Sequence, residues 1–256
     1  MEQGGTGGSE AKALAVALLL GLTASGCTTA RLQGFDTLAS RPDLEALPIS
    51  GLPWNGEGDF RLGATTGHAA WRSAAAAQGW GPDGDVPAEQ VRVGQVARLG
   101  LIAFSLGAEA TPGYLEGRCR YGRTEERTHI FGLDIATAGR PLRLQCAYRL
   151  DERDAGTLTL IAQPPADGIA EPRIGMIRFD GHDLQLRSDH AIEGAGPSAG
   201  PMGYRLTTAD GRLVGLVETN GWRDRRLLLT REAAERPAAI AAALSLALFR
   251  DPGDTD

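Results

Sequence analysis

The chain has 256 residues, of which 42% are hydrophobic and 23% charged, and its formal net charge is −6. This composition is typical of one or two folded domains with an apolar core, and the acidic balance excludes a nucleic-acid binder with a broad basic face. Three cysteines are too few for a four-thiolate zinc site. No apolar run reaches the roughly 18 residues of a membrane-spanning helix, which excludes a polytopic membrane protein.

The N-terminal segment has the pattern of a secretion signal. Residues 13–22 (ALAVALLLGL) form an apolar stretch, and Ala24, Ser25 and Gly26 precede Cys27. This ending resembles the lipobox of bacterial lipoproteins, in which the cysteine receives a diacylglyceryl group. The resemblance implies that residues 1–26 are a signal peptide and that Cys27 carries the lipid. The alternative is a short buried helix that ends in a cysteine by chance.

The residues after Cys27 set the expected location and the domain boundary. Thr28 stands where an Asp favours retention in the inner membrane, so the resemblance implies an anchor in the outer membrane, with the protein facing the periplasm. Residues 27–58 show no sustained period and contain three prolines. We therefore expect the lipidated cysteine and a flexible tether over 27–58, and a single β-rich domain over 59–256.

Short apolar segments separated by turn residues follow the tether, and they predict a mainly β fold, an antiparallel sandwich or barrel. Asp180-Gly181 and Asp210-Gly211 lie between such segments and indicate hairpins. Residues 69–78 are alanine-rich and predict a helix that ends at Gly79. The predicted strands are 60–64, 96–106, 115–121, 142–150, 157–162, 173–179, 183–187, 202–207, 212–218 and 226–229.

Two of the predicted strands each carry a cysteine two residues before a tyrosine. Strand alternation places Cys119 and Cys146 on the apolar faces of their strands. An oxidising envelope and adjacent strands favour a disulfide between them. The alternative is two independent buried thiols. No C-x-x-C spacing indicates a metal or redox pair.

The opposite faces of the same two strands carry arginines. Arg118, Arg120, Arg143 and Arg149 share one exposed face if the strands are adjacent. Guanidinium groups suit bidentate binding of phosphate or carboxylate, so an anionic envelope ligand is a candidate partner. The alternative is a solvated face balanced by nearby carboxylates, namely Glu116, Glu125, Glu126, Asp151 and Glu152.

Catalytic motifs are weak. Residues 196–200 (GPSAG) match the nucleophile pattern G-x-S-x-G, but Pro197 and Pro201 favour a loop over the strand-to-helix turn that the pattern needs. His182 and His190 lie at opposite ends of a predicted strand, too far apart to share a zinc ion. We expect neither a metal nor another cofactor. The tryptophans show no spacing that indicates a sugar platform.

Residues 238–249 (AAIAAALSLALF) are apolar nearly all round, which predicts a buried helix. A β-rich domain that ends in such a helix is similar in architecture to the tubby and scramblase-type barrels, whose sheet wraps a helix. The resulting hypothesis is a lipid-anchored envelope protein whose non-catalytic β-rich domain acts as a binding or structural module. The alternatives are an accessory subunit of an envelope complex and a hydrolase that acts on envelope polymers or lipids.

Overall fold

The computed structural model describes residues 30–53, 56–80, 91–130, 133–166, 170–221 and 223–251. The compact unit described below comprises Arg31–Asp256. It contains the helices α2 (Phe35–Ala39) and α3 (Arg236–Leu248). The strands are β1 (Leu44–Ser50), β2 (Glu57–Leu62), β3 (Thr65–Trp80), β4 (Val91–Leu106), β5 (Leu115–Ile130), β6 (Leu133–Ala138), β7 (Arg143–Leu150), β8 (Arg153–Ala162), β9 (Arg173–Phe179), β10 (His182–Asp189), β11 (Gly203–Thr207), β12 (Leu213–Glu218) and β13 (Arg225–Thr230).

The strands form a closed antiparallel barrel, which confirms the predicted fold class. The order is β4-β3-β2-β1-β13-β12-β11-β10-β9-β8-β7-β5, and β4 pairs with β5 to close the ring. β1, the first strand, pairs with β13, the last one. β6 pairs with the far part of β5 beyond the ring. The barrel is therefore complete only when both ends of the unit are in place.

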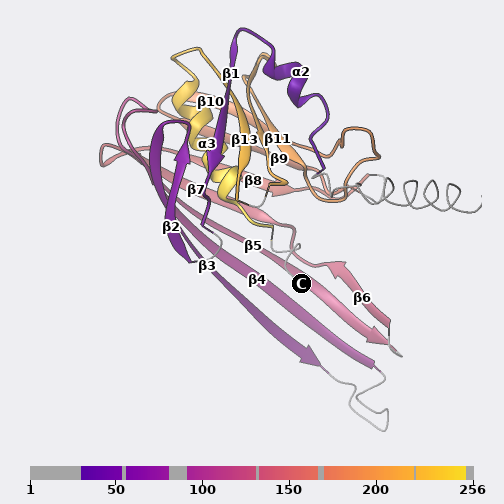
Figure 1. The fold of residues 1–256 in the computed structure, drawn as a ribbon. Coiled ribbons are helices and arrows are strands. Elements are labelled where there is room, and N and C mark those ends of the chain that lie inside the picture. Colours follow the sequence, from indigo (N-terminus) through magenta and orange to yellow (C-terminus); the bar gives the residue numbers. More distant parts are fainter. Residues whose placement is uncertain are drawn as a thin grey trace, which may run out of the picture. The chain divides into compact units, whose positions relative to one another are not determined.

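The C-terminal helix α3 lies inside the barrel (Figure 1). Every residue from Ala238 to Leu248 is buried, which confirms the prediction from its apolar composition. Six of these eleven residues are alanine, so the helix is thin enough for strands to pack around it. It contacts β5, β9, β10, β12 and β13. The core is thus a helix enclosed by one sheet.

The turn chemistry behaves as the sequence predicted. Phe179 and His182 are paired across a two-residue loop. Its two residues, Asp180 and Gly181, have positive φ angles of 47° and 84°, as this type of hairpin turn requires. Gly211, with φ of 87°, lies in the longer connection between β11 and β12. Both hairpins bring consecutive strands together as expected.

The helix predicted over residues 69–78 is wrong, because these residues belong to β3. Each residue from Gly67 to Trp80 has a partner on β4, from Leu106 to Val93. The prediction relied on the local helix preference of alanine, and pairing with a neighbouring strand overrides such preferences.

The prediction of a flexible tether up to residue 58 is also wrong for the described part of that segment. β1 pairs with β13 from Leu44 to Ile49, and both of these side chains are buried. Phe35 of α2 is buried as well, in a small cluster beside the main core. The strand was missed because its partner lies about 180 residues away, and because Pro48 interrupts its alternation.

Three strands continue beyond the ring. Residues 72–80 of β3, 91–101 of β4 and 123–130 of β5, together with β6, form a four-stranded extension that we call the arm (Figure 1). β2 runs beside β3 only as far as Ala70, and β7 runs beside β5 only as far as Gly122. The arm therefore lies beyond the ring of strands that encloses α3.

Candidate functional site

The base of the arm carries a regular grid of side chains on its outer face. Arg72, Leu101, Arg120 and Gln145 lie in one row across β3, β4, β5 and β7. Residues directly opposite each other on paired strands share a face of the sheet, so all four point outward, away from the disulfide. The next row along the arm is Ala74, Leu99, Gly122 and Arg143.

These two rows form the floor of a groove of about 790 Å³. Leu99 and Leu101 are each 56% exposed, so its centre is apolar and open. Arginines surround that apolar centre on several sides. The residues that line the groove are Arg72, Ser73, Ala74, Leu99, Gly100, Leu101, Arg120, Tyr121, Gly122, Arg123, Thr124, Arg140, Pro141, Arg143 and Gln145. We call this site the arginine groove.

Two local features shape the groove. A Cβ atom on Gly122 would lie 2.7 Å from Cδ2 of Leu99, so the leucine occupies the space that the missing side chain leaves. Thr124 fixes the segment that leads into β7, because its Oγ1 accepts a hydrogen bond from the Arg140 amide at 2.6 Å. The Thr124 amide in turn donates to the Arg140 carbonyl at 3.1 Å. These bonds hold Arg140 at the border of the groove.

Five arginines line the groove, and four of them have no carboxylate partner among the described residues, whereas Arg123 pairs with Glu125 at 3.2 Å. Arg120 donates to the Gln145 side-chain oxygen at 3.1 Å. Among the described residues, the guanidinium groups of Arg72, Arg140 and Arg143 have neither a hydrogen bond nor an ion pair. Four guanidinium groups around an apolar floor suit a molecule with an anionic group and an apolar part, since arginine binds phosphate and carboxylate through paired N–H groups.

The four arginines predicted from the sequence do share the outer face, but they divide into two pairs. Arg120 and Arg143 line the groove. Arg118 lies opposite Ala147 and Arg149 opposite Glu116, nearer the other end of their strands. The Arg149 guanidinium lies 3.9 Å from the Glu116 carboxylate and also donates to the Glu152 carbonyl. Sequence alternation found the face, but it missed Arg72 and Arg140, which lie on other segments.

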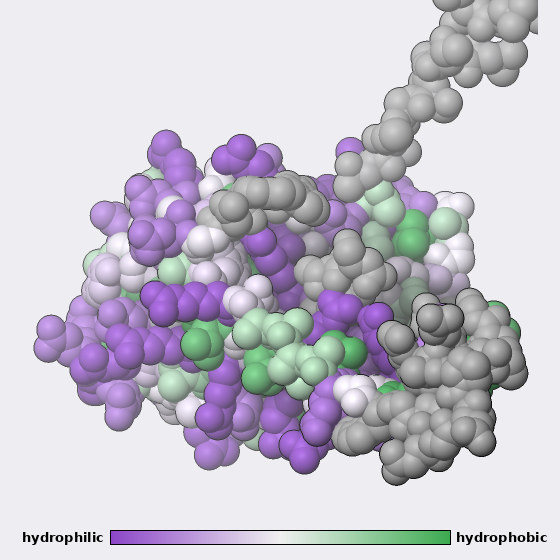
Figure 2. Space-filling model, turned by 90° about the horizontal axis from the view of Figure 1, so that it is seen from below, coloured by the Kyte–Doolittle hydropathy of each residue, from purple (hydrophilic) through white to green (hydrophobic). Residues whose placement is uncertain are grey.

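Exposed apolar side chains extend from the groove along the arm. Figure 2 shows hydrophobic atoms in the middle of the face seen from below, bordered by hydrophilic ones. Of the large hydrophobic side chains that are exposed in the described part of the chain, five share the outer face of the arm: Val93, Leu99, Leu101, Leu133 and Ile135. In the barrel the apolar side chains face inward, so the polarity of the strands reverses where the arm begins.

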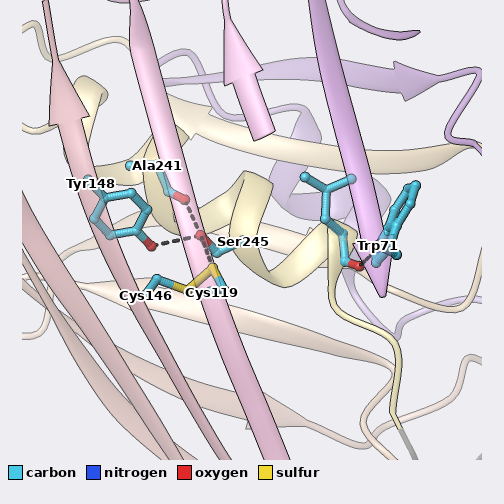
Figure 3. The surroundings of a disulfide bond; sticks show 7 residues. Trp71, Cys119, Cys146, Tyr148, Ala241 and Ser245 are labelled. Atoms are coloured by element: carbon cyan, nitrogen blue, oxygen red, sulfur yellow. Dashed lines mark hydrogen bonds between the residues drawn. A yellow bond between two sulfur atoms is a disulfide. The ribbon is translucent and has the colours of Figure 1, made fainter. Parts of the chain in front are cut away.

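The cysteines lie on the inner face, directly opposite each other on β5 and β7. Their sulfur atoms are joined at 2.09 Å, as the matched Cys-x-Tyr strands predicted. Figure 3 shows the disulfide beside Ser245 of α3. The Ser245 hydroxyl lies 2.7 Å from the Tyr148 hydroxyl, and it donates to the Ala241 carbonyl at 2.9 Å. The disulfide is therefore a buried cross-link of the barrel wall.

Helix α3 ends near three arginines, of which Arg173 is buried and Arg225 and Arg250 are half-buried. Arg173 is 2% exposed, and it donates to the Tyr204 hydroxyl at 3.0 Å and to the Asp251 carboxylate. Arg225 donates to the carbonyls of Gly221 and Leu246. Burial lowers the pKa of Arg225 to about 10, and the nearby charge of Arg250 acts in the same direction. Cations at the carboxyl end of a helix interact favourably with its dipole, so these groups stabilise α3.

The four histidines lie apart from one another in the described part of the chain. His68 pairs with Asp59 at 2.8 Å, and within the described ranges no group of three or more potential metal ligands gathers. His190 lies next to Ser188, with 2.9 Å between Nε2 and the serine Oγ. Its Nδ1 lies 3.0 Å from the Ser198 carbonyl oxygen. Ser198 lies in irregular structure, as the flanking prolines predicted, so it is not placed as a nucleophile elbow.

Several predictions concern residues that lie outside the description. Cys27 and residues 1–26 precede the described residues, so the lipid anchor stays a prediction. Trp54 and Trp222 are likewise outside. Trp71 donates from Nε1 to the Leu248 carbonyl at 2.8 Å, so it contacts the end of α3 (Figure 3). None of the helices in the described part of the chain is long and apolar enough to cross a bilayer.

Comparisons of the chain with protein-family models, with curated proteins and with solved structures find no match. The functional argument therefore depends on the arginine groove itself.

Proposed function

We propose that the chain is a lipid-anchored envelope protein whose barrel is a non-catalytic binding module for an anionic amphiphile. The anchor is Cys27, and the expected location is the outer membrane, facing the periplasm. Support for the anchor comes from the apolar run and the small residues before Cys27. Support for the binding role comes from the arginine groove, where four guanidinium groups that have no carboxylate partner in the described part of the chain surround Leu99 and Leu101.

Two kinds of contact bind the ligand in the groove, namely hydrogen bonds from arginines and apolar contacts. Phosphate or carboxylate oxygens accept charge-assisted hydrogen bonds from Arg72, Arg120, Arg140 and Arg143. The apolar part of the ligand covers Leu99 and Leu101 and removes their surface from water. Because the site is open, its electrostatic part weakens as salt rises.

The test is a titration of the full chain, held in one neutral detergent, with dihexanoyl phosphatidic acid. Dihexanoyl phosphatidylcholine and inorganic phosphate are the comparison ligands. We expect phosphatidic acid to bind most tightly and its affinity to fall with salt. Changing Arg120 and Arg143 to Gln together should weaken binding about tenfold, which corresponds to about 1.4 kcal/mol.

The matched control changes Arg118 and Arg149 to Gln, because these arginines share the face but lie outside the groove. This variant removes the same charge and should bind within about twofold of the parent. Equal loss of affinity in both double variants would mean that net charge, and not the groove, attracts the ligand. If phosphatidylcholine binds as tightly as phosphatidic acid, the net negative charge of the ligand does not contribute to its affinity, which would contradict the proposal.

A hydrolase is the second candidate, because the Ser188 hydroxyl and the His190 imidazole are within hydrogen-bond distance. A fluorophosphonate probe reacts with serines that a neighbouring base activates. We expect no labelling of Ser188, because its Oγ already accepts a hydrogen bond from the Arg173 amide at 2.8 Å. Labelling that disappears in Ser188→Ala would favour the hydrolase over the binding module.

A further inference from the structure

The edge of β3 is unpaired along the arm. The Trp71 amide donates to the Gly56 carbonyl at 2.7 Å, and in the described part of the chain no residue pairs with β3 on this side beyond that point. All residues from 72 to 79 are exposed. β3 is therefore an edge strand for half of its length, while it forms part of the closed ring in the other half.

Alternation shows which main-chain groups this edge presents. In an antiparallel pair, successive residues direct their N–H and C=O groups to opposite sides of the strand. Because Trp71 bonds toward Gly56, the odd-numbered residues Ser73, Ala75, Ala77 and Gly79 direct these groups to the free edge. The even-numbered residues direct theirs to β4, with which β3 pairs without a register shift.

The edge lacks the features that usually prevent strand addition. Edge strands are commonly short, bulged, or protected by lysine or proline. Residues 73–79 (SAAAAQG) contain no charged residue and no proline, and β3 pairs regularly with β4 throughout. The small side chains also leave the edge open on both faces of the sheet.

We propose that this edge pairs antiparallel with the same edge of a second copy of the chain, centred on Ala76. In this register Ala75 lies opposite Ala77 of the second copy, and Ser73 lies opposite Gly79. These odd-numbered pairs match donor to acceptor and form about eight main-chain hydrogen bonds. The inference goes beyond the proposed function, which does not require a second copy.

Self-complementarity is the reason for choosing a second copy as the occupant. The register brings no like charges together, because Arg72 lies opposite Trp80 and every position between them is uncharged. The antiparallel direction places the two barrels at opposite ends of the paired arms. The contact is isologous, so it closes at a dimer and does not continue into a filament.

Cross-linking of the full chain tests the register. Ala76→Cys places two cysteines directly opposite each other in a pair that does not exchange hydrogen bonds, with Cα atoms about 4.5 Å apart. That distance permits a disulfide. Ala74→Cys is the matched control on the same face of the same strand, but its two copies are offset by four residues, about 13 Å. The parent chain, which has Cys27 but no introduced cysteine, measures the background of cross-linking.

We expect a covalent dimer with Ala76→Cys under mild oxidation and only background with Ala74→Cys. Equal cross-linking at both positions, or a stronger cross-link with Ala75→Cys, would overturn the register. A cross-link to a different protein would overturn the choice of a second copy. These readouts do not involve the groove ligand, so failure here is distinguishable from failure of the proposed function.

A second variant tests the main-chain bonds by sedimentation of the full chain in neutral detergent. Ala75→Pro removes an N–H group that points to the free edge, and it leaves the bonds to β4 intact. We expect the parent and Ala76→Ser to sediment as dimers, and Ala75→Pro as a monomer. A parent that stays monomeric at micromolar concentration, or an Ala75→Pro variant that stays dimeric, would overturn the proposal.

Discussion

Tyr148 illustrates how burial inside the barrel keeps a single side chain protonated. Its hydroxyl is fully enclosed, and its polar contact is the Ser245 hydroxyl of α3 at 2.7 Å. Burial raises the pKa of Tyr148, since the phenolate loses its hydration, and the bond to Ser245 offsets only part of this effect. Burial raises the pKa of Tyr204 as well.

These raised pKa values predict a loss of stability in alkali. Unfolded tyrosines ionise near pH 10, while Tyr148 in the folded state stays protonated above that value. Its contribution is therefore complete below about pH 10 and is lost as the pH rises further. The free energy of unfolding should fall above pH 10 by about 1.4 kcal/mol per pH unit for each such tyrosine.

The measurement is urea unfolding of Tyr148→Phe and of the parent between pH 8 and 11. Above pH 10 the free energy of unfolding of the variant should fall less steeply than that of the parent, by about 1.4 kcal/mol per pH unit, the contribution of one buried tyrosine. The lowered pKa of Arg225 acts in both proteins and cancels in the comparison. Tyr114→Phe is the control because Tyr114 is 47% exposed, and it should follow the parent. Identical slopes for all three proteins would contradict the assignment.

At the scale of elements, helix α3 fills the barrel, so its side chains should contribute strongly to stability. Leu246 is fully buried in the centre of the barrel. Leu246→Ala should lower the free energy of unfolding by roughly 2–5 kcal/mol, because it leaves a cavity that the surrounding strands cannot fill. Denaturant unfolding at neutral pH measures this. A variant that unfolds together with the parent would show that α3 does not carry the core.

The elements also show what the sequence can predict. β9 was predicted at its observed bounds, and the two Asp-Gly hairpins were placed correctly, because alternation and turn residues are local signals. β3 was predicted as a helix, since its run from Ala74 to Ala77 has no alternation to read. β1 was missed because its partner strand lies at the opposite end of the unit. Local patterns fail where distant pairing decides the conformation.

The same distinction applies to the arginine groove. Arg120 and Arg143 were found from the sequence because both lie on strands whose cysteines indicated the alternation. Arg72 lies in the misassigned segment, and Arg140 lies in a connection whose position depends on Thr124. No sequence signal brings those two arginines together with the others. The apolar floor also required the register of β4 against β5.

At the scale of the whole molecule, the disulfide joins two neighbouring strands of the wall and closes a loop between residues 27 positions apart. Changing Cys119 and Cys146 together to Ala should cost about 3.5 kcal/mol in the chain-entropy model. Urea unfolding under non-reducing conditions measures the loss. Equal stability of the variant and the parent would show that the disulfide does not stabilise the fold by restricting the unfolded chain.

The predicted anchor concerns the whole molecule as well. Cys27→Ser should leave an unprocessed precursor, because the lipobox resemblance assigns both lipid attachment and cleavage to that cysteine. Mass spectrometry of the N-terminal peptide, combined with membrane fractionation, measures both. An unmodified Cys27 in a soluble mature chain would contradict the anchor and leave the groove proposal in place.

The enclosure of α3 has a consequence for biosynthesis. The barrel closes through β1 and β13, and the helix that fills it follows β13 in the chain. A growing chain therefore exposes the inward faces of its strands until α3 has been synthesised. Contacts between such distant segments also slow folding. The nascent protein should depend on a holding chaperone throughout translation, and a stop codon before Arg236 should yield a product that proteases remove.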